Sequence, residues 1–194
     1  MARRGAEQAK PARLDAAAWV AAAFDALAAG GVDAVRVEPL AKALGITKGS
    51  FYWHFADRRA LLDAMLDSWM QGRVAAIRQQ AALRGDPAAG LRDLADLYTR
   101  NANLRGLAIE LAIRALARTD AAAAKAVRSV DRERLKHVGD LFAALGWAQA
   151  EARARAVLFY SYLFGQSLLD PQAVPPASRA GVIDALLAGP QASS

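Results

Sequence analysis

Cysteine is absent from this chain of 194 residues, and histidine occurs only twice. The absence of cysteine excludes disulfides, thiolate nucleophiles and zinc fingers, and two histidines are too few for a multi-histidine metal site. We therefore expect neither a metal nor a cofactor. The sequence also lacks an uncharged apolar run of about eighteen residues, and its start, MARRGAEQAK, lacks the apolar segment of a signal peptide. We expect a cytoplasmic protein with no membrane partner.

Apolar side chains and positive charge are both plentiful. The chain is 55% hydrophobic, which is enough to form a core at this length. Its net charge of +6 and its pI near 10.1 favour a polyanionic partner. Residues 1–13 are predicted to form a basic flexible arm, and their composition fits a solvated tail as well as a nucleic-acid arm.

An all-α protein is expected, because alanine and leucine are abundant and no alternating strand pattern occurs. Thr47 is expected to cap the third helix through its hydroxyl, Asp57 to cap the fourth, and Asp86 with Pro87 to begin the fifth segment. The expected helices are 15–29, 38–44, 47–54, 57–78, 90–102, 105–118, 121–145, 149–168 and 178–188.

Two of these short helices, joined by a turn at Gly45, are typical of a helix-turn-helix at about 37–55. In that motif the second helix enters the major groove of DNA. The residues expected to face outward at its start are Thr47, Lys48, Gly49 and Ser50. Lys48 is the best candidate to donate to a guanine edge, and Glu38 is expected either to repel phosphates or to select cytosine.

Five ring-bearing side chains follow one another in this motif, although only 7% of the chain is aromatic. Phe51 and Phe55 are four residues apart on one helix face, so we expect them in the core. Tyr52 and His54 lie off that face and are expected to donate to phosphate oxygens. A buried, hydrogen-bonded Tyr52–His54 pair is the alternative, and Trp53 is intermediate.

The segment GITKGSFYWHFADRRALLDA resembles the helix-turn-helix and following helix of the TetR family of bacterial transcriptional regulators. The positions on the family pattern are Gly45, Ile46, Thr47, Phe51, Tyr52, His54, Phe55, Leu61 and Leu62. The similarity covers roughly residues 14–70. One departure is Val37, where the family usually has a Ser or Thr that caps the second helix.

The resemblance implies a homodimer on a palindromic double-stranded DNA operator, with a C-terminal domain that commonly binds a small-molecule effector. By position, the DNA contacts that it implies are Arg36, Thr47, Lys48, Gly49, Ser50, Tyr52, Trp53, His54 and Arg58. We therefore predict a three-helix DNA-binding domain at 14–60, a helical ligand-binding and dimerisation domain at 61–189 and a tail at 190–194.

Side chains of two further kinds are candidates in the C-terminal domain. The ligand-pocket candidates are Trp69, Arg73, Tyr98, Asn101, Glu110, Phe142 and Trp147, although core packing explains the aromatics equally well. Apolar side chains surround most of the helix near residue 160, which suggests burial on more than one side. In the resembling family the last two helices form the dimer interface. The interface candidates are Val157, Tyr160, Phe164, Leu168, Ile183 and Leu187.

The sequence thus predicts a DNA-binding transcriptional regulator, a repressor released by a small-molecule ligand, and not an enzyme. One alternative is a constitutive DNA-binding protein without an inducer. A second is a helical enzyme that uses a C-terminal cavity, but the chain offers no convincing nucleophile–base pair. His137 is expected to be solvated, and Asp63 and Asp67 are expected to lie on a charged helix face.

Overall fold

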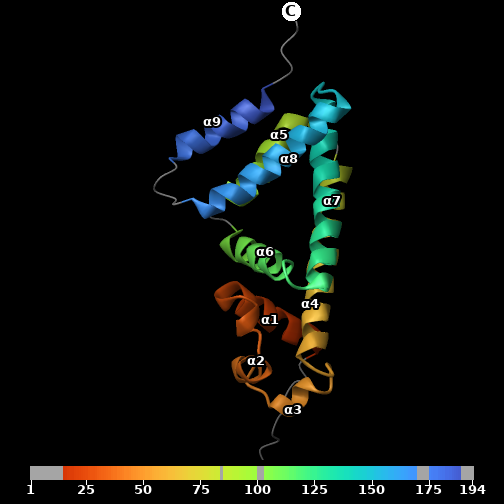
Figure 1. Cartoon of the computed structure of the whole chain (residues 1–194), viewed down its shortest axis with the longest axis vertical. Helices are drawn as coiled ribbons and strands as arrows, with labels where there is room; N and C mark the ends of the chain where they lie inside the picture. Colours follow the sequence, from red (N-terminus) through yellow and green to blue (C-terminus); the bar gives the residue numbers. More distant parts are fainter. Residues whose placement is uncertain (1–14, 84, 100–102, 170–174, 189–194) are drawn as a thin grey trace, which may run out of the picture. The chain divides into compact units, whose positions relative to one another are not determined.

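The computed structural model describes residues 15–83, 85–99, 103–169 and 175–188 (Figure 1). Within these ranges every regular element is a helix, which confirms the predicted all-α fold. The chain divides into two compact units, with the boundary between Met65 and Leu66. This boundary falls inside one long helix, α4 (Arg58–Ala82). The predicted basic arm and the predicted tail lie outside the described residues.

The first unit is built from α1 (Ala16–Gly30), the 3₁₀ turn η1 (Val32–Ala34), α2 (Val37–Ala43), α3 (Lys48–Phe51) and the start of α4. The side chain of Asp15 accepts a hydrogen bond from the backbone N–H of Ala18 and so caps α1. Trp19 of α1 and Phe51 of α3 are both fully buried, with their rings edge to face at 5.1 Å between centroids. This pair joins the helix-turn-helix to the first helix.

The turn between α2 and α3 depends on Gly45, whose φ of 67° lies in the left-handed region that favours glycine. The third helix is shorter than predicted, because Tyr52 and the two residues after it form turns. Thr47 is the N-cap residue of this helix. The prediction that its hydroxyl accepts a hydrogen bond from a free backbone N–H of the helix is wrong, because its side chain makes no capping bond. The prediction for Asp57 is confirmed, since its carboxylate accepts from the N–H of Ala60 at 2.8 Å.

The second unit contains the rest of α4 and five further helices. They are α5 (Pro87–Thr99), α6 (Leu104–Leu116), α7 (Ala121–Ala144), α8 (Gln149–Gly165) and α9 (Pro176–Leu187), with the 3₁₀ turn η3 (Gln166–Leu168) after α8. Asp86, Asn103 and Asp120 each accept a hydrogen bond from a free N–H in the first turn of α5, α6 and α7. The prediction that Asp86 and Pro87 begin the fifth segment is confirmed, although the predicted range 90–102 starts three residues late. The predicted start of α9 is two residues late, because Pro176 occupies the first helical position.

The core of the second unit lies between α5, α7, α8 and α9, and α7 packs most extensively on α8. Leu91, Val138, Phe142, Phe159 and Leu163 have no exposed surface there. His137 is also buried, which contradicts the expectation of a solvated histidine, and burial lowers its pKa. Within the described ranges, no helix combines the length and apolarity needed to cross a membrane.

Candidate functional site

The start of α3 is the first candidate site. Thr47, Lys48 and Gly49 are exposed and Ser50 is half-buried, while Phe51 at the end of the same short helix is fully buried. Leu40 and Ala41 of α2 are buried as well. The apolar residues therefore fix α2 and α3 on the unit's core and leave the small and polar residues at the start of α3 facing solvent.

Lys48 does not stand alone on this surface, because its ammonium group forms an ion pair with the carboxylate of Glu38. Half of the Lys48 side chain and 64% of the Glu38 side chain are exposed. Their hydrogen bond and opposite charges raise the pKa of Lys48 and lower the pKa of Glu38, so both groups are charged at neutral pH. Lys48 was predicted to contact a base edge and Glu38 either to repel phosphates or to select cytosine, but an ion pair between them was not predicted.

The ring side chains divide as predicted between core and surface. Phe51 and Phe55 are buried, with exposed fractions of 0% and 7%, whereas Tyr52 and His54 are exposed. The alternative of a buried Tyr52–His54 pair is wrong. Trp53 is 82% exposed, so this large apolar ring lies almost wholly in solvent. Contact of these side chains with DNA remains a prediction.

Arg58 is positioned differently from the sequence-based expectation. Its Nε donates to the carbonyl oxygen of Val35 at 2.6 Å, and one Nη donates to that of Val32 at 2.6 Å. The guanidinium is thus committed to holding the η1 turn against the start of α4. Val37 also differs: it is the first residue of α2 and its side chain is buried, while Arg36 is the N-cap residue and makes no side-chain capping bond.

A cavity of about 230 Å³ in the second unit is the second candidate site. Of the predicted pocket residues, Arg73, Tyr98 and Glu110 line it. Trp69, Phe142 and Trp147 are buried and do not line this cavity, so their role in a ligand pocket stays a prediction. Asn101 lies outside the described residues. The aromatic residues were ambiguous from the start, since core packing and cavity lining favour the same residue types.

The cavity-lining residues that sequence reasoning did not assign to a pocket include Arg134 of α7 and Tyr160 of α8. Arg134 lies four residues after Val130 and four before Val138, both of which are fully buried. A charged residue on the same helix face as these apolar residues was the available signal. Tyr160 carried no such signal, because it belongs to a segment that is apolar on nearly every side.

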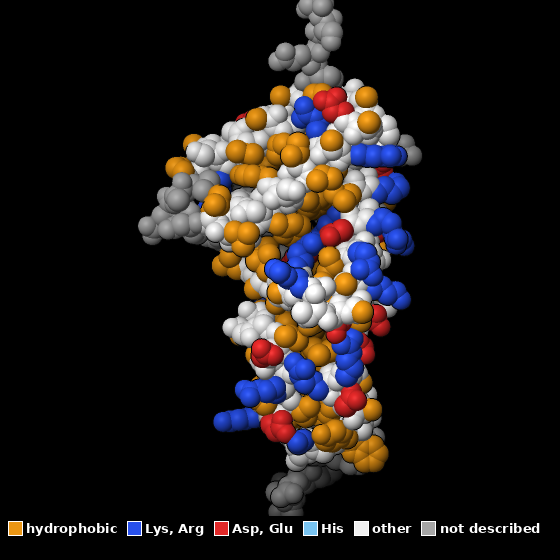
Figure 2. Space-filling model, in the orientation of Figure 1, with side chains coloured by type: hydrophobic (Ala, Val, Ile, Leu, Met, Phe, Trp, Pro, Cys, Tyr) orange, Lys and Arg blue, Asp and Glu red, His pale blue; other side chains and the backbone are white. Residues whose placement is uncertain are grey.

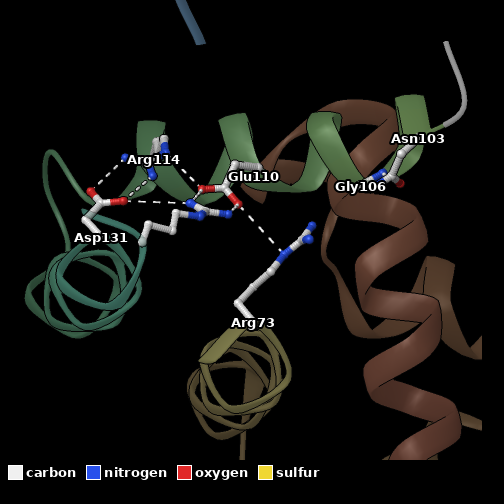
Figure 3. A network of polar contacts seen from close by, with 7 residues as sticks. Arg73, Asn103, Gly106, Glu110, Arg114 and Asp131 are labelled. Atoms are coloured by element: carbon white, nitrogen blue, oxygen red, sulfur yellow. Dashed lines mark hydrogen bonds and ion pairs between the residues drawn. The ribbon is translucent and has the colours of Figure 1, made fainter. Parts of the chain in front are cut away.

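A partly buried network of charges reaches the cavity, and its members Arg73, Glu110 and Arg134 line it (Figure 3). Glu110 is 1% exposed, and its two carboxylate oxygens accept from the terminal nitrogens of Arg134 at 2.7 and 2.8 Å. Arg114 donates its Nε to Glu110 at 2.9 Å and its terminal nitrogens to Asp131 at 3.0 and 2.5 Å. These hydrogen bonds satisfy charges that burial alone would make very costly.

Two opposing effects act on the ionisation of Glu110. Burial raises the pKa of a carboxyl group, but here the hydrogen bond and charge of Arg134, and the charges of Arg114 and Arg73, outweigh it and lower the pKa of Glu110. In turn, the interaction with Glu110 raises the pKa of Arg134 against its own burial. The Glu110 carboxylate and the Arg134 guanidinium are therefore both ionised.

The predicted interface residues separate into two groups. Tyr160, Ile183 and Leu187 are buried in the core of the second unit, and their place in a dimer interface stays a prediction. Phe164 is half-buried, whereas Val157 is 51% and Leu168 is 81% exposed. Figure 2 shows apolar side chains gathered over α8 on the viewed face. The exposed large apolar residues of α8, η3, α9 and the residue after η3 are Val157, Leu158, Leu168, Leu169 and Val182.

Known proteins are similar in sequence to the part of this chain that contains the first candidate site. The sequence profile described as "Bacterial regulatory proteins, tetR family" matches residues 20–65. The class A tetracycline repressor from transposon 1721 of Escherichia coli is 41% identical over 51 residues, which are 26% of this chain and 24% of that protein. The class G tetracycline repressor of Vibrio anguillarum is 34% identical over 61 residues, 31% of this chain and 29% of that protein. The similarity thus spans about a quarter of the length of these relatives.

Similarity of fold extends over nearly the whole chain. A transcriptional regulator from Rhodococcus sp. RHA1 superposes with a TM-score of 0.73 at 22% identity, covering 90% of this chain and 94% of that one. GusR of Salmonella enterica gives a TM-score of 0.67 at 17% identity, covering 94% and 99%. At such low identity these structures establish the fold alone, while the profile match covers the helix-turn-helix. Residues 20–65 of the chain are therefore similar to the profile of the tetR family of bacterial regulatory proteins, and this part holds the helix-turn-helix.

Proposed function

We propose that this protein is a sequence-specific transcriptional regulator that binds a palindromic operator as a homodimer and is a repressor released by a small-molecule effector. It acts in the cytoplasm as a regulator rather than as an enzyme. The observation that carries the proposal is the exposed start of α3, backed by the fully buried Phe51 and flanked by the exposed Tyr52 and Trp53.

This surface suits DNA for physical reasons. Gly49 and the small hydroxyl side chains of Thr47 and Ser50 allow the backbone to approach phosphates closely, and the N–H groups at the start of a helix favour anions. Lys48 would exchange the carboxylate of Glu38 for a base edge or a phosphate. Tyr52 and His54 add donors suited to phosphate oxygens.

The cavity of the second unit supports the regulatory part of the proposal. A helical core with no function beyond packing does not need a space of about 230 Å³ beside a buried charge network. An effector bound there would favour a dimer state whose recognition helices no longer match half-sites about one helical turn, ~34 Å, apart. The exposed apolar residues of α8 and α9 supply surface for the dimer.

The experiment is to capture genomic fragments with the purified protein, sequence them, and measure binding of the enriched fragment by fluorescence anisotropy. We expect a palindromic site, bound by a dimer with an affinity that falls steeply with salt. Lys48→Ala should weaken binding of that site. The matched control is Lys136→Ala, which removes an exposed, ion-paired lysine from α7 instead. Enrichment of no common sequence, or equal losses for the two variants, would contradict the proposal.

A further inference from the structure

One arginine that lines the cavity keeps its N–H donors available, although its charge acts on Glu110. Arg73 makes no hydrogen bond with any described residue, and its nearest partner is Glu110, whose Oε2 lies 3.9 Å from the Arg73 Nε. Figure 3 shows the two terminal nitrogens of Arg73 directed away from Glu110. The side chain is 32% exposed, whereas Arg134 is only 3% exposed. Arg73 therefore offers its planar set of N–H donors to the cavity.

Charge in the network is not balanced. Three arginines, Arg73, Arg114 and Arg134, surround two carboxylates, those of Glu110 and Asp131, which leaves one positive charge in excess among the described residues. Arg134 neutralises Glu110 through two hydrogen bonds, and Arg114 does the same for Asp131. The excess charge is thus that of Arg73. A guanidinium partly removed from water is stabilised by an anion, and a carboxylate matches its geometry.

Apart from the polar side chains of Gln80 and Asn103, the rest of the cavity is largely apolar. Ile77, Leu94, Leu97 and Leu107 line it beside Tyr98 and Tyr160. Neither tyrosine hydroxyl donates to a described residue, and burial raises the pKa of both, so both stay protonated and able to donate. A dry apolar cavity of roughly 150 Å³ is known to hold benzene. A space of about 230 Å³ therefore admits a ring or short chain together with a small polar group.

From these observations we infer that the effector is a small organic monoanion, with an apolar ring or chain between the leucines and a carboxylate bound to Arg73. The inference rests on the proposed function, because it takes the cavity to be the effector site. A cationic ligand is disfavoured, because Glu110, the only carboxylate among the described residues that line the cavity, is already covered by Arg134 and Arg114.

Ligands that are matched in shape test whether a negative charge on the ligand is needed for binding. We would titrate the full-length protein, without DNA, by calorimetry with 3-phenylpropanoate, its amide and 3-phenylpropylamine, and then with octanoate and octanamide. The members of each set have nearly the same shape and differ in the charge of the polar group. At least one carboxylate should bind ten or more times as tightly as its amide, and the amine should not bind. Absence of binding by both carboxylates, or equal binding of acid and amide, would overturn the inference.

Two variants on the same helix test the role of Arg73. Arg73→Gln should abolish the preference for the carboxylate over the amide, and Arg73→Lys should keep part of it. The control is Arg78→Gln, since Arg78 also lies on α4 but pairs at the surface with Glu133. This control should keep the wild-type preference. Retention of the full preference by Arg73→Gln, with its melting temperature unchanged, would refute the assignment of Arg73.

The two measurements distinguish a wrong ligand class from a wrong proposed function. Calorimetry without DNA decides the class, whereas anisotropy with the captured operator decides whether the bound carboxylate releases DNA. A carboxylate that binds through Arg73 without changing operator affinity supports the class and refutes its role as an effector. A carboxylate that fails to bind a protein fully competent in operator binding refutes the class alone.

Discussion

Lys48 of α3 and Glu38 of α2 form an ion pair across the turn that connects the two helices of the helix-turn-helix. In the free protein the lysine best placed to contact DNA is therefore held by a carboxylate on the same surface. Because the pair is exposed, it contributes little to the free energy of unfolding. In the proposed DNA complex, we expect Glu38 to compete with DNA for Lys48 and to repel phosphates.

Glu38→Gln should therefore tighten DNA binding. The change removes a negative charge next to the DNA and frees Lys48, so we expect affinity to rise a few-fold for operator and unrelated DNA alike. Anisotropy titrations at several salt concentrations measure this rise. Asp140→Asn breaks the corresponding Lys136 pair on α7 and serves as the control. Weaker binding by Glu38→Gln would mean that Glu38 itself contacts a base.

Lys48→Ala should cost about 1–3 kcal/mol, and mostly at one base-pair position, if the lysine reads a base edge. Binding of an operator library in which each position is substituted in turn would locate that position. A uniform loss over all sequences would instead assign Lys48 to a phosphate. The double variant with Glu38→Gln then tells how much of the lysine's contribution is offset by the ion pair.

Tyr52→Phe should weaken binding to all sequences to a similar extent, because a hydroxyl bound to phosphate carries no sequence information. The ring is kept in this variant, so its edge-to-face contact with Phe51 at 5.2 Å is preserved and the fold should be unaffected. Anisotropy with operator and with unrelated DNA, together with a melting curve, tests both statements. A selective loss on the operator alone would show that Tyr52 reads a base.

How far the sequence could predict these sites differed between the two units. The helix-turn-helix was predictable because its residues occur in one continuous segment, where helical spacing separates the buried Phe51 from the exposed Tyr52. The Lys48–Glu38 pair was not, because it depends on how the turn at Gly45 brings two helices together. The cavity was least predictable, since Arg73, Glu110 and Arg134 come from three helices and no spacing along the chain relates them.

Glu110→Gln should destabilise the protein strongly. The substitution leaves Arg134, which is 3% exposed, without its carboxylate partner, and breaking a buried pair in this way costs about 3–5 kcal/mol. Urea unfolding followed by circular dichroism measures the change. Glu133→Gln is the matched control, because it breaks the surface pair with Arg78 and should cost roughly 0–1 kcal/mol. Equal stabilities of the two variants would contradict the described network.

The same network predicts how stability depends on pH. The arginines lower the pKa of Glu110 in the folded protein below its unfolded value, so the folded state binds a proton less readily than the unfolded chain does. The stabilisation is therefore fully present above the carboxyl's ordinary pKa of about 4.3 and is lost as pH falls through the lower, folded value. We expect the difference in free energy of unfolding between wild type and Glu110→Gln to be constant from about pH 8 to 5 and to shrink below that.

Taking this difference cancels the acid sensitivity of the buried His137, whose lowered pKa acts equally in both proteins. A difference that stayed constant down to the lowest pH at which both proteins fold would mean that Glu110 is not ionised through its arginine partners.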